Sequence, residues 1–237
     1  NVVYINPGKT QTHGSSPGIF GTTRPLTIDD ALALRRGSFV EAVVPAVSGN
    51  AQVEGGGRSR RATVSAVGPE MPQVFSFKVK AGRFLPDDDP NSPRAVAVLG
   101  SKLKQELFGN ANPLGQIIRI GGDRYRVIGV MEPKGTVLGF DLDDTVYIPA
   151  ARGLEMFNRD NLMEIDIAFR EGTPIDKVTQ FIKRVLIARH GREDFTITTQ
   201  DQMLDVLGSV LVEGDYSPEV EGVIWQVGAL WVLDTTE

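Results

Sequence analysis

Few side chains in this 237-residue chain are suited to catalysis or to metal binding. The chain has two histidines, His13 and His190, and no cysteine. Thiol nucleophiles and the common zinc sites are therefore nearly excluded. A Ser-His-Asp triad has no support from a Gly-x-Ser-x-Gly motif. We expect no catalytic, cofactor-binding or metal-binding residue in this chain, and no enzyme activity.

The two histidines have simple structural interpretations. His190 lies at the end of a strong helical pattern, directly before Gly191, and a cation at a helix C-terminus is favoured by the helix dipole. His13 lies in the Gly/Ser/Thr/Pro-rich segment 7–25 with no acidic residue nearby. We expect that segment to be a loop and His13 to be exposed to solvent.

Two acidic clusters could in principle supply oxygen ligands to calcium. They are Asp87–Asp89 and the group Asp141, Asp143 and Asp144. Carboxylates suit calcium, but neither cluster has the spacing of an EF-hand loop. Runs of charge are usually solvated, so we expect both clusters to be ordinary surface.

The glycine-rich stretch LFGNANPLGQ, residues 107–116, resembles a phosphate-binding loop only superficially. A P-loop needs Gly-Lys-Ser/Thr at fixed spacing before a helix, whereas this stretch follows a helix and leads into a strand. An anion would meet the unfavourable end of the helix dipole there. The stretch predicts a helix that ends at Gly109 and a turn at Asn112-Pro113.

One compact basic group remains, formed by Arg58, Arg60 and Arg61 beside the glycines 55–57. The three glycines between two strand-like segments predict a hairpin. Two interpretations stay open: the arginines cover a solvated hairpin tip, or they contact a partner. The formal net charge of -5 argues against a nucleic-acid partner.

The elements that carry these residues follow a β-α-β order at each end of the chain. At the first end we expect a strand at 2–5, a helix capped by Thr27 and a strand at 40–48. At the other end we expect a strand at 164–169, a helix between 173 and 191 and a strand at 195–198. Such units pack as a split βαβ sandwich of the ferredoxin type. Pro45 predicts that the strand at 40–48 lies at a sheet edge or carries a bulge.

The middle of the chain is richer in short strands, so the expected fold class is α+β, a split βαβ subdomain with an inserted, mostly β subdomain. Two glycines at 121–122 predict a hairpin within the insertion. No segment reaches the roughly 18 apolar residues that a membrane-spanning helix needs, and residues 1–5 lack the features of a signal peptide. From these features alone the chain is expected to be soluble.

The order of several short motifs resembles the MacB-like periplasmic core domain of ABC transporter permeases. A Gly-Arg-Phe sequence at 82–84 precedes an acidic loop, and a Tyr-Ile-Pro sequence stands at 147–149. Between them lie AVAVLG at 95–100, LFG at 107–109, NPLG at 112–115 and RVIGV at 126–130. Each motif alone is weak, but their order is specific and the resemblance covers about residues 1–210.

The resemblance implies an arrangement in two parts on the outer side of the cytoplasmic membrane. Residues 1–74 together with 161–210 correspond to a porter-like subdomain, and residues 75–160 to a sabre-like inserted subdomain. The segment 211–237 is left unassigned, because the family would continue there into a long apolar helix.

The function implied by the resemblance is mechanical. This periplasmic domain would couple cytoplasmic ATP hydrolysis to efflux, or to lipoprotein or peptide export, by motion and partner binding. ATP hydrolysis would belong to a separate nucleotide-binding domain. The other partners would be the transmembrane helices of the permease and a periplasmic adaptor (membrane-fusion) protein. The full transporter would be a homodimer and the isolated domain a monomer.

Two other classes of function stay open. One is a periplasmic module that binds a ligand or a lipid in an apolar groove between the subdomains. The other is a secreted hydrolase, which would need a cleft with perturbed titratable groups.

Overall fold

The computed structural model describes residues 1–8, 24–137, 140–203 and 205. His13 and the segment 211–237 therefore lie outside the described residues. The helices are α1 (Ile28–Leu34), α2 (Met71–Phe75), α3 (Ser101–Phe108), α4 (Ala150–Met156) and α5 (Ile175–His190). The strands of the main sheet are β1 (Val2–Pro7), β2 (Val40–Gly55), β3 (Arg58–Val67), β4 (Val79–Gly82), β5 (Val96–Leu99), β6 (Ile117–Ile120), β7 (Asp123–Met131), β10 (Thr145–Pro149), β11 (Glu164–Phe169) and β12 (Phe195–Thr199). A separate two-stranded sheet is formed by β8 (Thr136–Val137) and β9 (Phe140–Asp141).

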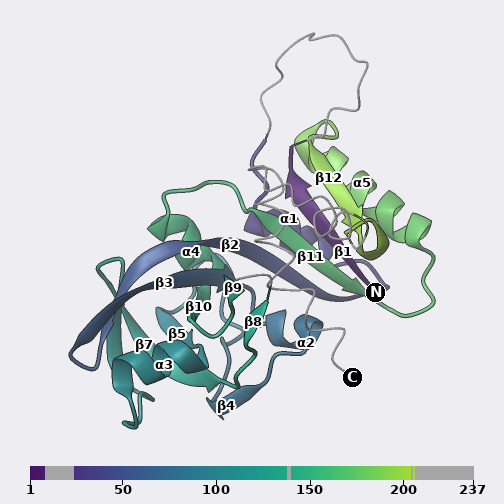
Figure 1. Cartoon of the computed structure of the whole chain (residues 1–237). Helices are drawn as coiled ribbons and strands as arrows, with labels where there is room; N and C mark the ends of the chain where they lie inside the picture. Colours follow the sequence, from purple (N-terminus) through teal and green to yellow (C-terminus); the bar gives the residue numbers. More distant parts are fainter. Residues whose placement is uncertain (9–23, 138–139, 204, 206–237) are drawn as a thin grey trace.

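The two ends of the chain form the expected split βαβ arrangement. Strands β12, β1, β11 and β2 lie side by side in that order, and each neighbouring pair is antiparallel. Helix α1 connects β1 to β2, and helix α5 connects β11 to β12. Both helices lie on the same face of these strands, over a shared hydrophobic core (Figure 1). The expected α+β class and the ferredoxin-like topology are confirmed.

Local sequence explains where the two helices begin and end. The hydroxyl of Thr27 accepts a hydrogen bond from the backbone N–H of Asp30, and the Asp30 carboxylate accepts one from the N–H of Thr27. This reciprocal pair is a capping box, which satisfies two backbone donors at the helix start. Helix α5 ends at Gly191, whose positive φ of 82° suits glycine.

Strand β2 is an interior strand, so of the two alternatives drawn from Pro45 the sheet edge is wrong, whereas the strand does carry a bulge, at Glu41. β2 pairs with β11 on one side and with β3 on the other. Pro45 lies one residue beyond the last β2–β3 pair, Ala46 with Val67, so its missing N–H removes no hydrogen bond to β3. The bulge lies four residues before Pro45, because Ala42 pairs with Ala168 and Val40 with Phe169, which leaves Glu41 as the extra residue of β2.

The main sheet continues through the middle of the chain without a break. β3 pairs in parallel with β10, and the order then runs β10, β5, β7, β4. β6 closes this part by pairing with both β2 and β7. The β2–β3 hairpin forms a long curved ribbon, in which β2 runs from the split βαβ part to the opposite end of the molecule (Figure 1). We call that opposite end, where the hairpin turns, the distal end. Whether the chain divides into the two subdomains at 74/75 and 160/161 stays a prediction.

Alternate residues of β2 supply three hydrophobic clusters on the two faces of the sheet. Val43 belongs to the cluster under α1 and α5. Val47 and Val53 belong to a second cluster, which includes residues of α3. Val44 belongs to a third cluster, which includes Met71 and Phe75 of α2. Successive side chains of a strand point to opposite faces, so the third cluster lies on the face opposite α1 and α5.

The two turns predicted from glycine are confirmed. Glycines 56 and 57 connect β2 to β3, and glycines 121 and 122 connect β6 to β7, all four with positive φ. In the stretch 107–116, α3 ends at Phe108 and the Asn112 side chain accepts a hydrogen bond from the N–H of Leu114, before β6 begins at Ile117.

Within the described ranges, no helix is both long enough and apolar enough to cross a membrane.

Candidate functional site

The structure separates the three arginines that the sequence placed in one basic group. Arg58 and Arg60 lie on the face of β3 that carries α3, because the Arg58 guanidinium donates a hydrogen bond to the backbone oxygen of Glu106 in that helix. Arg61 is the next residue along the strand and points to the opposite face. A single contact surface made of all three side chains is therefore not formed.

Arg60 is engaged within the chain. Its Nε and Nη2 atoms lie 3.0 and 2.8 Å from the two carboxylate oxygens of Asp144. Such bidentate pairs fix the guanidinium in one orientation. Arg60 therefore holds β3 to the start of β10, with its side chain still partly exposed; whether it also contacts a partner stays a prediction.

Arg58 instead shares the distal end of the molecule with two arginines from another hairpin. An open hollow at this end is lined by Arg58 and by Arg119 and Arg124, which form a cross-strand pair between β6 and β7. All three side chains are exposed. Ile117, one of the few large apolar side chains that is more than a third exposed, lies beside them. We call Arg58, Arg119 and Arg124 the distal arginine surface.

The acidic clusters are used in contacts within the chain. Asp88 forms a two-pronged pair with Arg94, and the Asp141 carboxylate lies 2.6 Å from the ammonium of Lys102. The Asp143 carboxylate accepts hydrogen bonds from the backbone N–H groups of residues 134 and 135. In the described part of the chain, no three His, Asp or Glu side chains come together in a way that could hold a metal ion.

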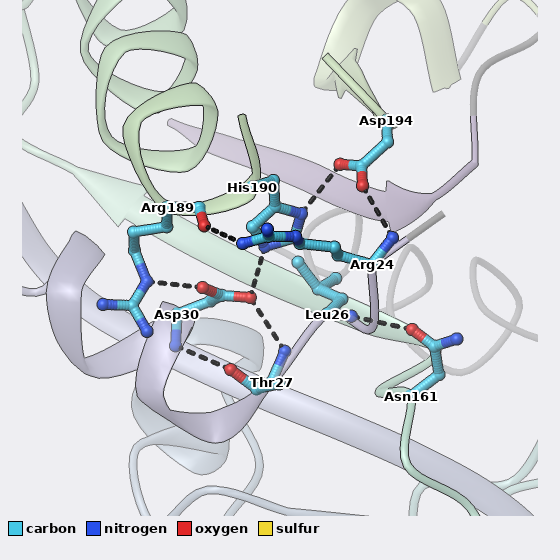
Figure 2. Close-up of polar contacts among 8 residues, drawn as sticks. All are labelled: Arg24, Leu26, Thr27, Asp30, Asn161, Arg189, His190 and Asp194. Atoms are coloured by element: carbon cyan, nitrogen blue, oxygen red, sulfur yellow. Dashed lines mark hydrogen bonds and ion pairs between the residues drawn. The ribbon is translucent and has the colours of Figure 1, made fainter. Parts of the chain in front are cut away.

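His190 lies where expected, at the end of α5, but it is buried between two carboxylates (Figure 2). Its Nδ1 atom is 2.7 Å from Asp194 and its Nε2 atom is 2.8 Å from Asp30. Both ring nitrogens of a histidine are donors only in the doubly protonated ring, so this geometry suits an imidazolium that bridges α5 to the start of α1. Asp30 also accepts a hydrogen bond from Arg189 at 2.6 Å.

Further hydrogen bonds extend this bridge. The backbone N–H of Arg24 donates to Asp194, and the guanidinium of Arg24 donates to the backbone oxygen of Arg189. Burial alone would raise the pKa of Asp30, but hydrogen bonds from Arg189, from the Thr27 N–H and from His190 outweigh it and lower the pKa below 3.8. The carboxylate is thus held in its charged form.

The cluster has the side-chain types of a hydrolytic triad without its geometry. Both nitrogens of His190 already face carboxylates, so neither can take a proton from a nucleophile. The neighbouring hydroxyl, that of Thr27, accepts the helix-capping hydrogen bond of α1. The arrangement joins two helices and is not suited to nucleophilic catalysis.

A cavity of about 130 Å³ lies next to α2, on the face of the sheet away from α1 and α5. Its walls are mostly apolar and include Met71, Phe75, Phe77 and Tyr147. Two acidic side chains of the interior strand β11, Glu164 and Asp166, also line it, although they are only 2% and 1% exposed.

The two carboxyl groups of β11 are unusual because no described cation accompanies them. Glu164 accepts a hydrogen bond from the amide of Asn6 at 3.1 Å, whereas neither oxygen of Asp166, taken as a carboxylate, has a hydrogen-bond donor. Burial, together with the charge of Glu164, raises the pKa of Asp166 well above 3.8, and burial also raises the pKa of Glu164. A proton on Asp166 would let it donate a hydrogen bond to Glu164.

Sequence reasoning missed these features for different reasons. Glu164 and Asp166 alternate with Ile165 and Ile167 in the strand expected at 164–169, and such alternation is typical of a strand with one solvated face. The pairing of Arg119 with Arg124 is the one local feature among them, because the predicted hairpin at 121–122 places these two residues opposite each other. The partners of His190 could not be found, since Asp30 lies 160 residues away in the chain.

Comparison with known proteins gives the same fold from two solved structures. The periplasmic region of MacB from Actinobacillus actinomycetemcomitans superposes with a TM-score of 0.70 and 25% identity, covering 88% of this chain and 92% of that one. The extracellular domain of the noncanonic ABC-type transporter YknZ from Gram-positive bacteria has a TM-score of 0.67 and 20% identity, covering 84% of this chain and all of that one.

The sequence relatives belong to transporters. The macrolide export ATP-binding/permease protein MacB of Shewanella sp. (strain W3-18-1) is 32% identical over 201 residues, which are 84% of this chain and 30% of that protein. The pyoverdine export ATP-binding/permease protein PvdT of Pseudomonas entomophila (strain L48) is 30% identical over 208 residues, 86% of this chain and 31% of that protein. The chain spans less than a third of the length of these relatives.

The split βαβ arrangement with its inserted strands thus defines the extracytoplasmic domain of an ABC transporter permease. Residues 1–185 match the model of the MacB-like periplasmic core domain, and the chain belongs to that family. The resemblance noted from the order of the motifs is confirmed, and so is the periplasmic location that it implied.

Proposed function

We propose that this periplasmic domain transmits motion within an ABC transporter permease and has no chemistry of its own. Cytoplasmic ATP hydrolysis, on a separate nucleotide-binding domain, would move the membrane helices. The domain would pass that motion outward, and so drive efflux or the export of a lipoprotein or a peptide. Export of macrolides and of pyoverdine by the relatives named above fits this role.

The observation that carries the proposal is the continuity of the main sheet. β2 pairs with β11 near its start, with β3 along most of its length and with β6 near its end. A hydrogen-bonded sheet of this kind resists bending of one part against another, because every strand shift would break a row of hydrogen bonds. A displacement of the split βαβ part would therefore move the distal hairpins as well.

The partners of the domain follow from the same proposal. They are the transmembrane helices and nucleotide-binding domain of the permease, together with a periplasmic adaptor (membrane-fusion) protein. The full transporter would be a homodimer held by its membrane and cytoplasmic parts. The distal arginine surface supports adaptor binding, since three exposed guanidinium groups beside an exposed apolar side chain suit an acidic protein surface.

The test is deletion of the domain from the full-length permease, in a host that lacks its own copy of the permease. We expect a permease whose domain is replaced by a short linker to keep hydrolysing ATP in membranes but to lose export. The separate 237-residue chain should show no hydrolysis of ATP. Export that persists without the domain would overturn the proposal.

The adaptor contact has a separate test with a matched control. Arg58→Glu combined with Arg119→Glu should weaken adaptor capture by the permease, because it reverses two charges of the distal arginine surface. Arg36→Glu combined with Arg159→Glu reverses the same number of charges at two exposed arginines outside the distal arginine surface and should leave capture unchanged. Equal effects of the two changes would show that the contact depends on overall charge alone.

The cavity beside α2 favours a second candidate function, binding of a ligand. It has apolar walls and two buried carboxyl groups, which are features of small-molecule sites. A secreted hydrolase has no comparable support, because the nitrogens of His190 are both engaged.

A further inference from the structure

The cavity beside α2 combines an acidic end with an aromatic wall. Asp166 lies opposite Tyr4 of β1 and Val44 of β2 in the strand register, on the face away from α1 and α5. Glu164 lies two residues earlier on the same face. Across the cavity, Phe77 and Tyr147 are in edge-to-face contact, with ring centroids 6.1 Å apart.

The ionisable side chains of the cavity wall are all acids. The titratable side chains that line it or face the carboxyl pair are Asp141, Glu164, Asp166, Tyr147 and the cross-strand neighbour Tyr4. No lysine, arginine or histidine is among the described residues of the cavity wall. Desolvated carboxyl groups need a proton or a cation, and the described wall supplies no cation.

Two lysines contact the wall without supplying that charge to the carboxyl pair. Lys102 is paired with Asp141 at 2.6 Å. Lys134 places its ammonium 5.2 Å from the centre of the Phe77 ring. Burial, Asn6 and the two carboxyl groups themselves account for the pKa shifts of Glu164 and Asp166, with no lysine or arginine contributing.

We propose that this cavity binds an organic cation, an amine carried on a small apolar group, with Glu164 and Asp166 holding the ammonium and the aromatic wall holding the apolar part. Carboxylates neutralise an ammonium directly, and aromatic faces attract it through their quadrupole. The volume of about 130 Å³ is slightly below that of an apolar cavity of about 150 Å³ that takes up benzene, so the apolar group can be no larger than about one ring, with the ammonium at the acidic end. The site stands on the cavity alone and does not depend on the role in transport.

The experiment uses benzylammonium as the probe and benzyl alcohol as its neutral counterpart of nearly the same shape. Titration calorimetry on the 237-residue chain should give saturable binding of benzylammonium, about ten-fold tighter than that of benzyl alcohol. Binding should be tighter at about pH 8 than at about pH 5, because the carboxyl pair is more fully ionised at the higher pH.

Three substitutions locate the site. Asp166→Asn should weaken benzylammonium binding about ten-fold, whereas Asp160→Asn removes an exposed carboxylate and should change nothing. Ser65→Leu fills the cavity wall and keeps both carboxyl groups, so it should abolish binding of either probe. Circular dichroism checks that each variant is folded.

The proposal is overturned by any of three results. The first is no saturable binding of benzylammonium to the unchanged chain. The second is equal binding of the alcohol. The third is binding that survives in both folded variants Asp166→Asn and Ser65→Leu, since the probe would then occupy another place.

Discussion

At the scale of single residues, the ring of His190 joins α5 to the start of α1 through two buried carboxylates, Asp194 and Asp30. The same Asp30 side chain caps α1. One aspartate thus connects the start of one helix to the end of another, which are far apart in sequence. The sequence predicted the helix end and the cap separately, because each signal is local, but it carried no sign that the two meet.

His190→Ala should lower the free energy of unfolding by about 3 to 5 kcal/mol, because it leaves two buried carboxylates without their shared donor. Arg189→Ala removes a partner of Asp30 that is 40% exposed, and should cost no more than about 1 kcal/mol. Urea unfolding at neutral pH measures both values. Similar values for the two variants would mean that the buried ring contributes little.

The carboxyl pair of β11 should give the opposite sign of pH dependence to that of Asp30. The pKa of Asp166 is raised in the folded state, so the folded chain holds a proton that the unfolded chain releases above about pH 4. The pair therefore destabilises the fold above the raised pKa, and this cost disappears as the pH falls towards about 4. The lowered pKa of Asp30 stabilises the fold above 3.8, and this contribution is lost as the pH falls below that value.

Asp166→Asn should accordingly be more stable than the unchanged chain at about pH 8, by about 1 to 3 kcal/mol. An asparagine amide can donate a hydrogen bond to Glu164 at any pH, whereas the Asp166 carboxyl group must first take up a proton. The difference should shrink as the pH approaches about 4. Urea unfolding of both chains across this range measures it, with Asp160→Asn as the exposed control. A variant that is less stable than the unchanged chain at every pH would contradict this account.

At the scale of elements, helix α4 lies closely against the β2–β3 ribbon because one of its residues is glycine. A Cβ atom on Gly153 would lie 2.1 Å from the Cβ of Ala66 in β3 and 2.9 Å from Val47 in β2. Neither neighbour can move freely, since Ala66 and Val47 are both buried. The helix therefore depends on a missing side chain for its distance from the sheet.

Gly153→Ala should lower the free energy of unfolding by about 2 kcal/mol, since the clash outweighs the higher helix propensity of alanine, which is worth about 1 kcal/mol. Adding Ala66→Gly removes the nearest clashing atom and should recover part of the lost stability. Urea unfolding of the two single variants and the double variant gives the coupling energy as a double-mutant cycle. If Gly153→Ala alone were as stable as the unchanged chain, α4 could shift away from the sheet at no cost in free energy.

The strands that end at glycine turns could be predicted from the sequence, whereas the interior position of β2 in the sheet could not. The hairpins at 55–57 and 121–122 were found because the signals for a turn lie within a few residues. Pro45 correctly indicated a bulge in this strand but not its interior position, because whether a strand is interior depends on where its neighbours end. Here β3 ends its pairing at Ala46, one residue short of the proline.

At the scale of the whole molecule, the split βαβ topology followed from the sequence because it repeats a β-α-β pattern at each end. The continuity of the sheet did not follow, since it depends on the parallel pairing of β3 with β10. That pairing joins Thr63 to Thr145 and Val67 to Pro149, with two helices and several strands between them in the chain. No periodicity in a sequence indicates such a contact.

The separate chain should sediment as a monomer at micromolar concentration. We expect the homodimer of the transporter to be held mainly by membrane helices and nucleotide-binding domains. Three large apolar side chains are exposed in the described part, Ile117 of β6 and Ile175 and Ile187 at the two ends of α5. Three such side chains are too few for a large hydrophobic interface. Sedimentation velocity over a range of concentrations measures this, and a tight dimer would contradict it.

The shared β2–β3 hairpin also limits how members of this family can recombine. A segment 75–160 exchanged alone between two relatives would arrive without the strands that pair with β6 and β10. Each of those pairings would then join side chains that never evolved together. A viable chimera would have to carry residues 47–160, with one junction after the last β2 residue that pairs with β11, Ala46, and the other before β11. New distal halves in this family should therefore be inherited together with their own hairpin.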